Sequence, residues 1–276
     1  MPGTAPRIPR GAGARLVAMS DLHYTVIGPA DAPVVLLLHG LGACADDWRM
    51  QVPALATRYC MLAVDLPGHR HSAPERGLPS IPRMAVAVER LLDALTIDRA
   101  HVVGLSLGGC VALALVLRAP ARVRSLVLVN TFARLRPGPR ALARGAVRCV
   151  LALVAPMRVV AAYVARETFP APEQSALRRA AEERLAANPR RRYVASLAAL
   201  TRFDVEQRLG GIHCPTLVVA GARDATVPLA AKEMLARSIP GASLRVVGDS
   251  GHVTPFDQAE GFNRLLLEHL ADVDGA

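Results

Sequence analysis

The chain has 276 residues, of which 52% are hydrophobic, and a formal net charge of +10. This length and apolar content exclude a disordered chain and are sufficient for one large α/β domain with a buried core. Arginine supplies nearly all of the positive charge, and aromatic residues make up only 4% of the chain, so we expect no nucleic-acid partner.

Two further features concern the cellular location. The longest uncharged apolar run, residues 102–117, is interrupted by glycines and a serine and is too short for a transmembrane segment. The five cysteines form an odd set without metal-ligand spacing, which predicts free thiols and a cytoplasmic location.

Short apolar runs alternate with helical patterns through the first half of the chain. A hairpin is predicted over 15–19 and 23–27, and strands over 33–38, 60–64, 101–104 and 125–130. Helical spacing of apolar residues lies between these strands, over 81–95 and 107–118. The run PVVLLL is apolar throughout, as in a strand that is covered on both faces.

The alternation stops after residue 131 and resumes after about residue 204. The intervening segment has no strand pattern and is predicted to form several helices, broken at Pro137, Pro139, Pro156, Pro170, Pro172 and Pro189. Strands over 216–220 and 243–247 then alternate with helices over 229–238 and about 257–270. We therefore predict an α/β fold, a mostly parallel eight-stranded sheet with helices on both faces. The core comprises 1–131 and 206–276, and a helical cap, 132–205, is inserted after the sixth strand.

The candidate nucleophile is Ser106, which follows an apolar strand directly and precedes an apolar helix. Glycines stand two residues before it and two after it, at Gly104 and Gly108. A serine on a sharp strand-to-helix turn brings these positions so close to neighbouring backbone that they have to be small. The spacing therefore predicts a hydroxyl that projects from the carboxyl edge of the sheet, where ligands of such folds bind.

A serine nucleophile needs a base, and the base needs a carboxylate. His252 follows the strand 243–247 and so reaches the same edge, whereas His69 and His71, after an earlier strand, are its competitors. Asp224 follows the strand 216–220 and is the favoured carboxylate. Asp249 is the alternative, but it lies only three residues from His252 and would have difficulty facing the imidazole ring.

Backbone amides are candidates for stabilising the negative charge that develops on the substrate oxygen. We predict the N–H groups of Leu107, after the nucleophile, and of Leu41, in the loop that begins with His39 and Gly40. The alternative is that this loop is an ordinary strand-ending turn. Trp48, the only tryptophan, follows the loop and is a candidate for the substrate pocket, with plain core packing as the alternative.

Five motifs occur in order along nearly the whole chain: HGLG (39–42), DLPGHRHS (65–72), GLSLGG (104–109), GARDATVP (221–228) and GDSGHVTPFDQAEGF (248–262). With them the sequence resembles the α/β-hydrolase superfamily. The resemblance implies that fold, and the serine at the nucleophile position implies ester-type hydrolysis without metal or organic cofactor. In the family the DLPGHRHS loop is structural, which argues against His69 and His71; Arg70 departs from the glycine that many relatives carry there.

The segment Asp46-Asp47-Trp48 and the stretch RLGGIHCPTLVVAGARDATVP (208–228) are most similar to 3-oxoadipate enol-lactonases and small-ester carboxylesterases. Cofactor-free perhydrolases and haloperoxidases share the same triad and stay open as alternatives, and a ligand receptor on this scaffold is the non-enzymatic one.

The predicted cap is rich in arginine, and Arg140, Arg144 and Arg148 share one helical face. One interpretation is a solvated face in an arginine-rich protein. The other is an anionic substrate or partner, either a carboxylate-bearing ester or lactone or an acyl carrier protein docked on the cap. Amphipathic segments around 146–164 leave a membrane surface as a further alternative.

Overall fold

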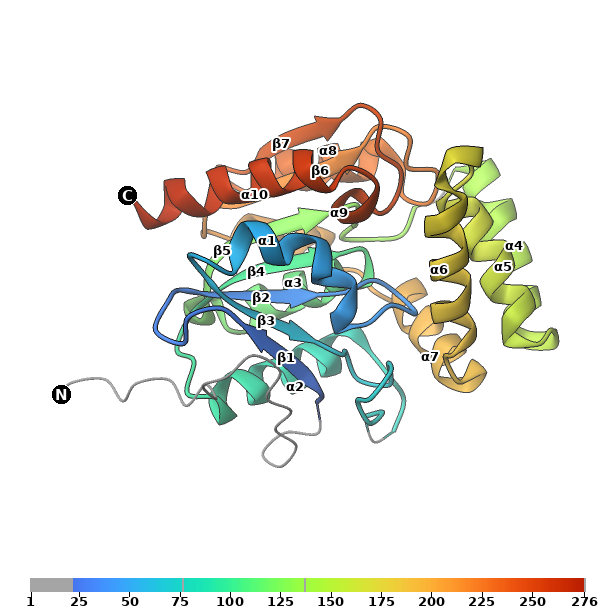
Figure 1. The fold of residues 1–276 in the computed structure, drawn as a ribbon, viewed down its shortest axis with the longest axis horizontal. Coiled ribbons are helices and arrows are strands. Elements are labelled where there is room, and N and C mark those ends of the chain that lie inside the picture. The colour runs from blue at the N-terminus through green and yellow to red at the C-terminus, as the bar shows by residue number, and fades with distance from the viewer. Residues whose placement is uncertain (1–21, 76, 137, 276) are drawn as a thin grey trace.

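A seven-stranded sheet forms the centre of the molecule (Figure 1). The structure, a computed structural model, describes residues 22–75, 77–136 and 138–275. The strand order is β1-β3-β2-β4-β5-β6-β7, and only β1 is antiparallel to its neighbour. The strands are β1 (Tyr24–Ile27), β2 (Val34–Leu38), β3 (Cys60–Val64), β4 (Ala100–Leu105), β5 (Val123–Val129), β6 (Thr216–Gly221) and β7 (Ser243–Val247). The mostly parallel sheet is confirmed, whereas the eighth strand, expected over 15–19, lies outside the described residues.

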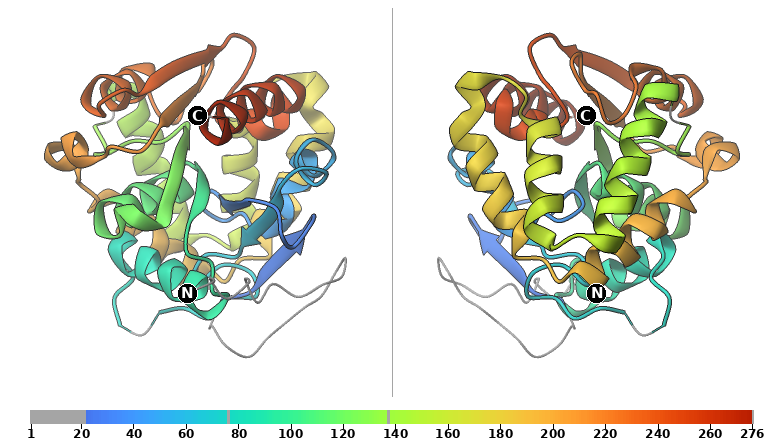
Figure 2. Two further views of the ribbon diagram at one scale, coloured as in Figure 1. Left: turned by 90° about the vertical axis from the view of Figure 1, so that its left-hand side faces the viewer. Right: turned by 90° about the vertical axis from the view of Figure 1, so that its right-hand side faces the viewer.

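Helices cover both faces of the sheet, as Figure 2 shows. On one face lie α2 (Ile81–Ala94), α3 (Leu107–Arg118) and α8 (Leu229–Ser238), and on the other lie α1 (Val52–Leu55) and α10 (Ala259–Asp274). Every residue of β2, β3, β4 and β6 is buried. This two-sided burial is the reason that these strands read as unbroken apolar runs.

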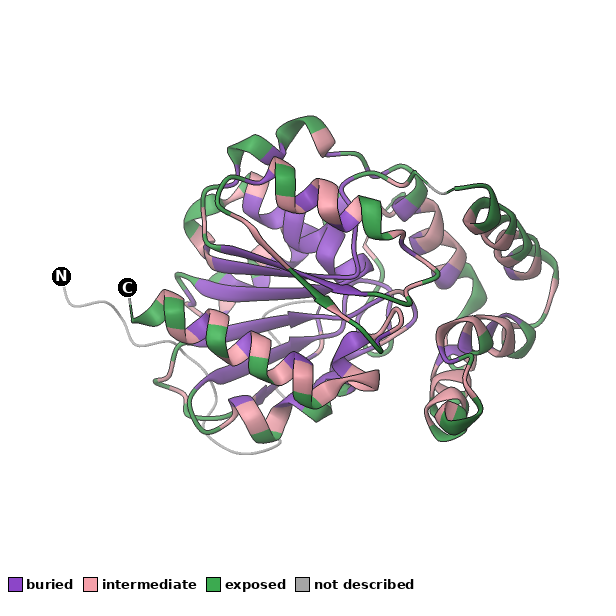
Figure 3. Ribbon diagram, turned by 90° about the horizontal axis from the view of Figure 1, so that it is seen from above, coloured by how far each residue is buried: buried purple, intermediate pink, exposed green. Residues whose placement is uncertain are grey.

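Four helices between β5 and β6 in the chain lie beyond the carboxyl ends of the strands: α4 (Pro139–Val154), α5 (Met157–Thr168), α6 (Ser175–Ala186) and α7 (Arg190–Thr201) (Figures 1 and 3). We call them the cap. Prolines stand at or just before the starts of α4 and α5, of α7 and of the short helix Pro172–Gln174, where the missing N–H has no cost.

The two ends of the cap segment meet. Arg134 and Asp204 form an isolated β-bridge, and the Val205 N–H donates to the Ala133 carbonyl at 3.0 Å. The division of the chain at residues 131/132 and 205/206 stays a prediction.

The structure bears on two expectations, those about membrane-spanning segments and about the cysteines. No helix in the described part of the chain is long and apolar enough to cross a membrane. The cysteines, all five within the described ranges, are free thiols. The cytoplasmic location stays a prediction.

Candidate active site

Ser106 lies at the sharp turn between β4 and α3, with φ of 53° and ψ of −110°. This conformation is strained for a residue with a side chain. A Cβ atom on Gly104 would lie 2.4 Å from the Gly108 carbonyl oxygen, and one on Gly108 would lie 2.0 Å from the Leu38 carbonyl oxygen. The two glycines therefore permit the turn that presents the serine, for the reason that their spacing suggests.

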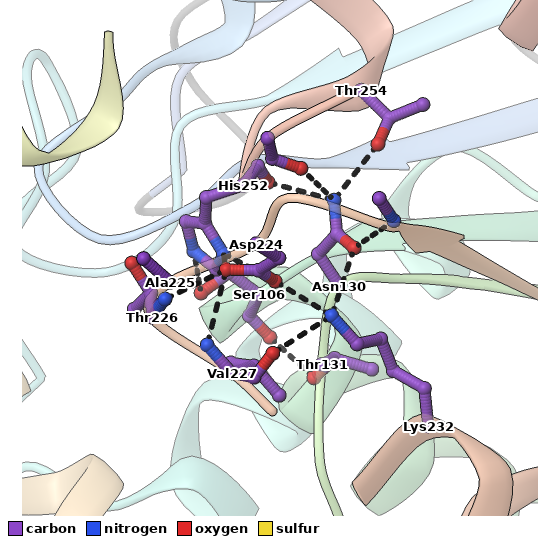
Figure 4. A network of polar contacts seen from close by, with 12 residues as sticks. Ser106, Asn130, Thr131, Asp224, Ala225, Thr226, Val227, Lys232, His252 and Thr254 are labelled. Carbon is purple, nitrogen blue, oxygen red and sulfur yellow. Dashed lines mark hydrogen bonds and ion pairs between the residues drawn. The ribbon is translucent and has the colours of Figure 1, made fainter. Parts of the chain in front are cut away.

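His252 reaches Ser106 from another loop, and Asp224 reaches His252 from a third (Figure 4). His252, after β7, places Nε2 3.0 Å from Ser106 Oγ, and its Nδ1 lies 3.0 Å from both carboxylate oxygens of Asp224, after β6. The Asp224 side chain is fully buried and that of His252 is 13% exposed. The structure thus brings the three predicted residues into one chain of contacts from hydroxyl to imidazole to carboxylate.

The competing residues lie elsewhere. The His69 ring packs against the His39 ring, and burial lowers the pKa of His69 to about 4. The His71 ring lies against that of His23. Asp249 is 74% exposed and pairs with Arg223 at 2.7 Å. These contacts give none of the three competitors a place beside Ser106.

Asp224 is held by more than His252. Its Oδ1 accepts the N–H groups of Thr226 and Val227 at 2.8 and 3.1 Å, and its Oδ2 accepts a hydrogen bond from Lys232 Nζ at 2.8 Å. Burial raises the pKa of Asp224, but His252 and Lys232 outweigh burial and hold the pKa well below its usual value. Our sequence reasoning missed Lys232, although its being the only lysine of the chain was a signal.

Asn130, directly after β5, supports the loop that carries His252. Its side-chain amide donates to the carbonyls of Gly251 and His252 and to Thr254 Oγ1, and its oxygen accepts the Gly221 N–H at 2.8 Å. Sequence reasoning missed this residue too. A polar residue at the carboxyl end of an otherwise apolar strand was the available signal.

The loop after β2 lies beside the nucleophile. A Cβ on Gly40 would be 3.8 Å from the Ser106 Cβ, which is ordinary contact, so the loop's steric need for glycine lies instead at Gly42, where φ is +77°. His39 Nε2 accepts the Leu66 N–H at 2.9 Å, so Nδ1 carries the proton and donates to the Gly40 carbonyl at 2.8 Å.

That hydrogen bond orients the peptide between Gly40 and Leu41. Because the N–H of a trans peptide points opposite to its carbonyl, the Leu41 N–H is directed away from His39. Leu107 provides the first amide of α3, and amides in the first turn of a helix have no acceptor within the helix. Both amides suit the predicted oxyanion role, which stays a proposal.

A cavity of about 430 Å³ lies between the sheet and the cap. Ser106 and His252 line it, as do His39, Gly40, Leu41 and Trp48, so the structure places all of the predicted pocket residues at the cavity. Trp48 is only 3% exposed and also belongs to the core. Trp48 therefore belongs to the core and lines the cavity, and its role in binding substrate stays a prediction. Sequence reasoning did not identify most of the cap residues on the opposite wall, such as Tyr163 and Leu177.

Within the described ranges, four arginines and two carboxylates line the cavity: Arg49, Arg144, Arg148, Arg184, Asp47 and Glu167. Arg184 forms an ion pair with Asp47, and Arg144 Nε lies 3.3 Å from Glu167 Oε2. Arg148 has no carboxylate partner among the described residues: its Nε donates to the Tyr193 hydroxyl at 2.7 Å, and its guanidinium lies over the Tyr193 ring. The wall therefore carries an excess of positive charge.

A sequence profile for the alpha/beta hydrolase fold matches residues 33–259. The chain belongs to this family. The hydrolase is 35% identical, over 92% of its length and 98% of the relative's, to the RutD protein of Stutzerimonas stutzeri, whose name assigns it provisionally to carbamate hydrolysis. It is also 35% identical to the pimeloyl-[acyl-carrier protein] methyl ester esterase of Chromobacterium violaceum, over 86% of this chain and 94% of that one.

Among solved structures, the hydrolase is similar to the enol-lactonase of Burkholderia xenovorans. The TM-score is 0.83 at 28% identity, with 90% of this chain and 96% of that one covered. These likenesses agree with the resemblance inferred from the five motifs, at the level of the family and of hydrolase activity.

Proposed function

We propose that this hydrolase cleaves a carboxylic ester or a lactone through an acyl-enzyme intermediate on Ser106. The observation that carries the proposal is the contact of 3.0 Å between Ser106 Oγ and His252 Nε2 at the wall of a cavity. A hydroxyl in contact with an imidazole whose other nitrogen faces a carboxylate is the arrangement that activates serine for attack on an acyl carbon.

The contacts suggest a role for each atom. The Nδ1–H donates to Asp224, which leaves Nε2 free to accept the Ser106 proton as Oγ bonds to the acyl carbon. The leaving alcohol takes that proton from His252. Water then gives a proton to His252 as it attacks the acyl carbon, and Ser106 regains its proton as the acid departs. The Leu41 and Leu107 amides stabilise the oxyanion in both steps.

We propose further that the substrate carries a carboxylate, which Arg148 binds. Tyr193 fixes the guanidinium through its hydroxyl and its ring, so the fork is oriented before a ligand arrives. Neither terminal nitrogen of Arg148 has a hydrogen-bond partner among the described residues. A carboxylate would accept both hydrogen bonds and neutralise the charge.

Arg148→Met is expected to reduce kcat/KM for an ester with a distal carboxylate by about 10- to 100-fold, the value of one or two charge-assisted hydrogen bonds. A neutral ester of equal length should change little. Arg140→Met removes an exposed charge from the first turn of the same helix and is the matched control. Equal effects of Arg148→Met on the two esters would contradict carboxylate binding.

An ester carried by an acyl carrier protein is the alternative substrate, and the cap surface favours it. Residues 132–205, which include the cap, contain fourteen arginines and five acidic residues, so this segment accounts for +9 of the net +10. Helix α4 also exposes large apolar side chains, with Val150, Leu153 and Val154 at 57–74%. An acidic carrier with an apolar contact surface would complement both features.

A panel of substrates tests these proposals together. It contains neutral p-nitrophenyl esters, a lactone, a carbamate, and a dicarboxylic acid methyl ester both free and linked to acyl carrier protein, with peracid formation and bromination assayed alongside. Turnover of the free anionic ester supports the first substrate class, and turnover of only the linked ester supports the alternative. Turnover of the carbamate alone, or of no acyl compound, would overturn the ester assignment.

A further inference from the structure

We propose that Lys232 is a positioning residue of the triad: its ammonium group holds the Asp224 carboxylate and offsets part of its negative charge, which extends activity to lower pH. The proposal rests on the proposed function, since it concerns the base of that reaction. None of the motifs that indicate the triad includes this residue.

Each N–H of the Lys232 ammonium group has an acceptor. Lys232 lies in the first turn of α8, and its Nζ contacts Asp224 Oδ2 at 2.8 Å, the Val227 carbonyl at 2.8 Å and Asn130 Oδ1 at 3.3 Å (Figure 4). Three acceptors match the three N–H groups of an ammonium ion. The side chains of Lys232 and Asp224 are both 0% exposed. These contacts fix the position of the ammonium group, because moving it would leave buried N–H donors and their acceptors without hydrogen bonds.

Lys232 and His252 contact the same carboxylate oxygen, Asp224 Oδ2. Oδ1 accepts two backbone amides and Oδ2 accepts Lys232 Nζ, while the Nδ1 of His252 lies 3.0 Å from both oxygens. Lys232 thereby keeps the carboxylate plane facing the imidazole. Burial lowers the pKa of Lys232 and Asp224 opposes that shift, whereas His252 and Lys232 outweigh burial and hold the pKa of Asp224 low. The three acceptors around Nζ are the partners that an ammonium group requires.

Few other charges face this pair. Asp257, on α9 (Thr254–Asp257), accepts the Gly251 N–H and the Ser250 hydroxyl, and burial raises the pKa of this carboxyl. From the cap, Arg144 binds the Ala225 carbonyl and is itself paired with Glu167. Among the described residues, Lys232 is therefore the positively charged residue that contacts the catalytic carboxylate and pairs with no other carboxylate.

The sign of the effect follows from Coulomb's law. A lone buried carboxylate strongly favours the imidazolium form of His252, which cannot accept the Ser106 proton. A lysine on that carboxylate opposes protonation of the imidazole. Removing the lysine therefore strengthens the attraction between Asp224 and a positively charged imidazole, and it also makes Asp224 easier to protonate. Both changes move the loss of activity on acidification in the same direction, to higher pH.

The test is the pH profile of kcat/KM for a neutral p-nitrophenyl ester. In Lys232→Met, we expect the midpoint of the acid limb to rise by about one pH unit, which is roughly a tenfold loss of kcat/KM below the limb. Lys232→Gln keeps a donor for Oδ2 without the charge. Its acid limb should therefore be shifted as in Lys232→Met, but its kcat at pH values above the limb should be higher than that of Lys232→Met. Arg237→Gln removes an exposed charge from the same helix and should leave the profile unchanged.

Two outcomes would overturn the role. A folded Lys232→Met or Lys232→Gln protein with a uniform loss at every pH and an unmoved limb would reduce Lys232 to a structural residue. If both variants fail to fold, NMR of the wild-type enzyme provides the test. Lysine labelled with ¹³C at Cε gives one side-chain signal, because Lys232 is the only lysine in the sequence. That signal should shift across the acid limb of activity, and a constant signal would contradict the coupling. Activity that survives Ser106→Ala would instead contradict the proposed function.

Discussion

Replacing Ser106 by alanine is expected to lower kcat for a short p-nitrophenyl ester by about 10⁵-fold or more while the protein stays folded. Alanine removes the oxygen that lies 3.0 Å from His252 Nε2 and leaves the turn without a nucleophile. The strained φ of 53° is no worse for alanine than for serine, so the thermal midpoint of unfolding should fall little, if at all.

Two measurements check this expectation. Steady-state kinetics compare the variant with Ser238→Ala, which removes a half-buried hydroxyl from α8, away from the cavity, and should keep full activity. A fluorophosphonate reagent followed by mass spectrometry should add one label to the wild-type protein, on Ser106, and none to Ser106→Ala. Full activity of a folded Ser106→Ala protein, or labelling at another residue, would end the assignment.

Asp224→Asn should lower kcat by about 10⁴-fold with the fold retained. The amide oxygen will occupy the Oδ1 position, because the Thr226 and Val227 N–H groups require an acceptor there. The amide NH₂ then faces both Lys232 Nζ and His252 Nδ1. Nδ1 lies 3.0 Å from both positions, and an NH₂ group at one of them repels the Nδ1–H and donates to an unprotonated Nδ1. The variant therefore favours the tautomer with the proton on Nε2, where it blocks acceptance of the Ser106 proton.

The control for this substitution is Asp249→Asn. Asp249 is the alternative carboxylate near His252 in the sequence, but it is exposed and paired with Arg223, so its loss should change kcat less than about twofold. Kinetics on both variants, with circular dichroism to verify folding, decide between the carboxylates. A large loss in Asp249→Asn together with normal activity in Asp224→Asn would reverse the assignment of the acid.

Local sequence determined much of the fold and the position of the candidate nucleophile. Apolar runs such as 33–38 and 60–64 indicate buried strands because burial on both faces removes every polar residue from a strand. The glycines two residues before and after Ser106 indicate the nucleophile turn, because the crowding that requires them arises within that one turn. The strand ends likewise bring Asp224 and His252 to the correct edge of the sheet.

Tertiary structure alone decided which groups meet there. Ser106 and His252 are 146 residues apart, and a contact over that separation depends on how whole strands pair, which no local pattern encodes. Three other features also depend on how distant segments pack. Asp249 is exposed whereas Asp224 is buried. Lys232 is buried against the Asp224 carboxylate, and Asn130 holds the loop that carries His252. The charge of Arg148 is likewise visible in the sequence, but its direction into the cavity depends on the packing of α4 against Tyr193 of α7.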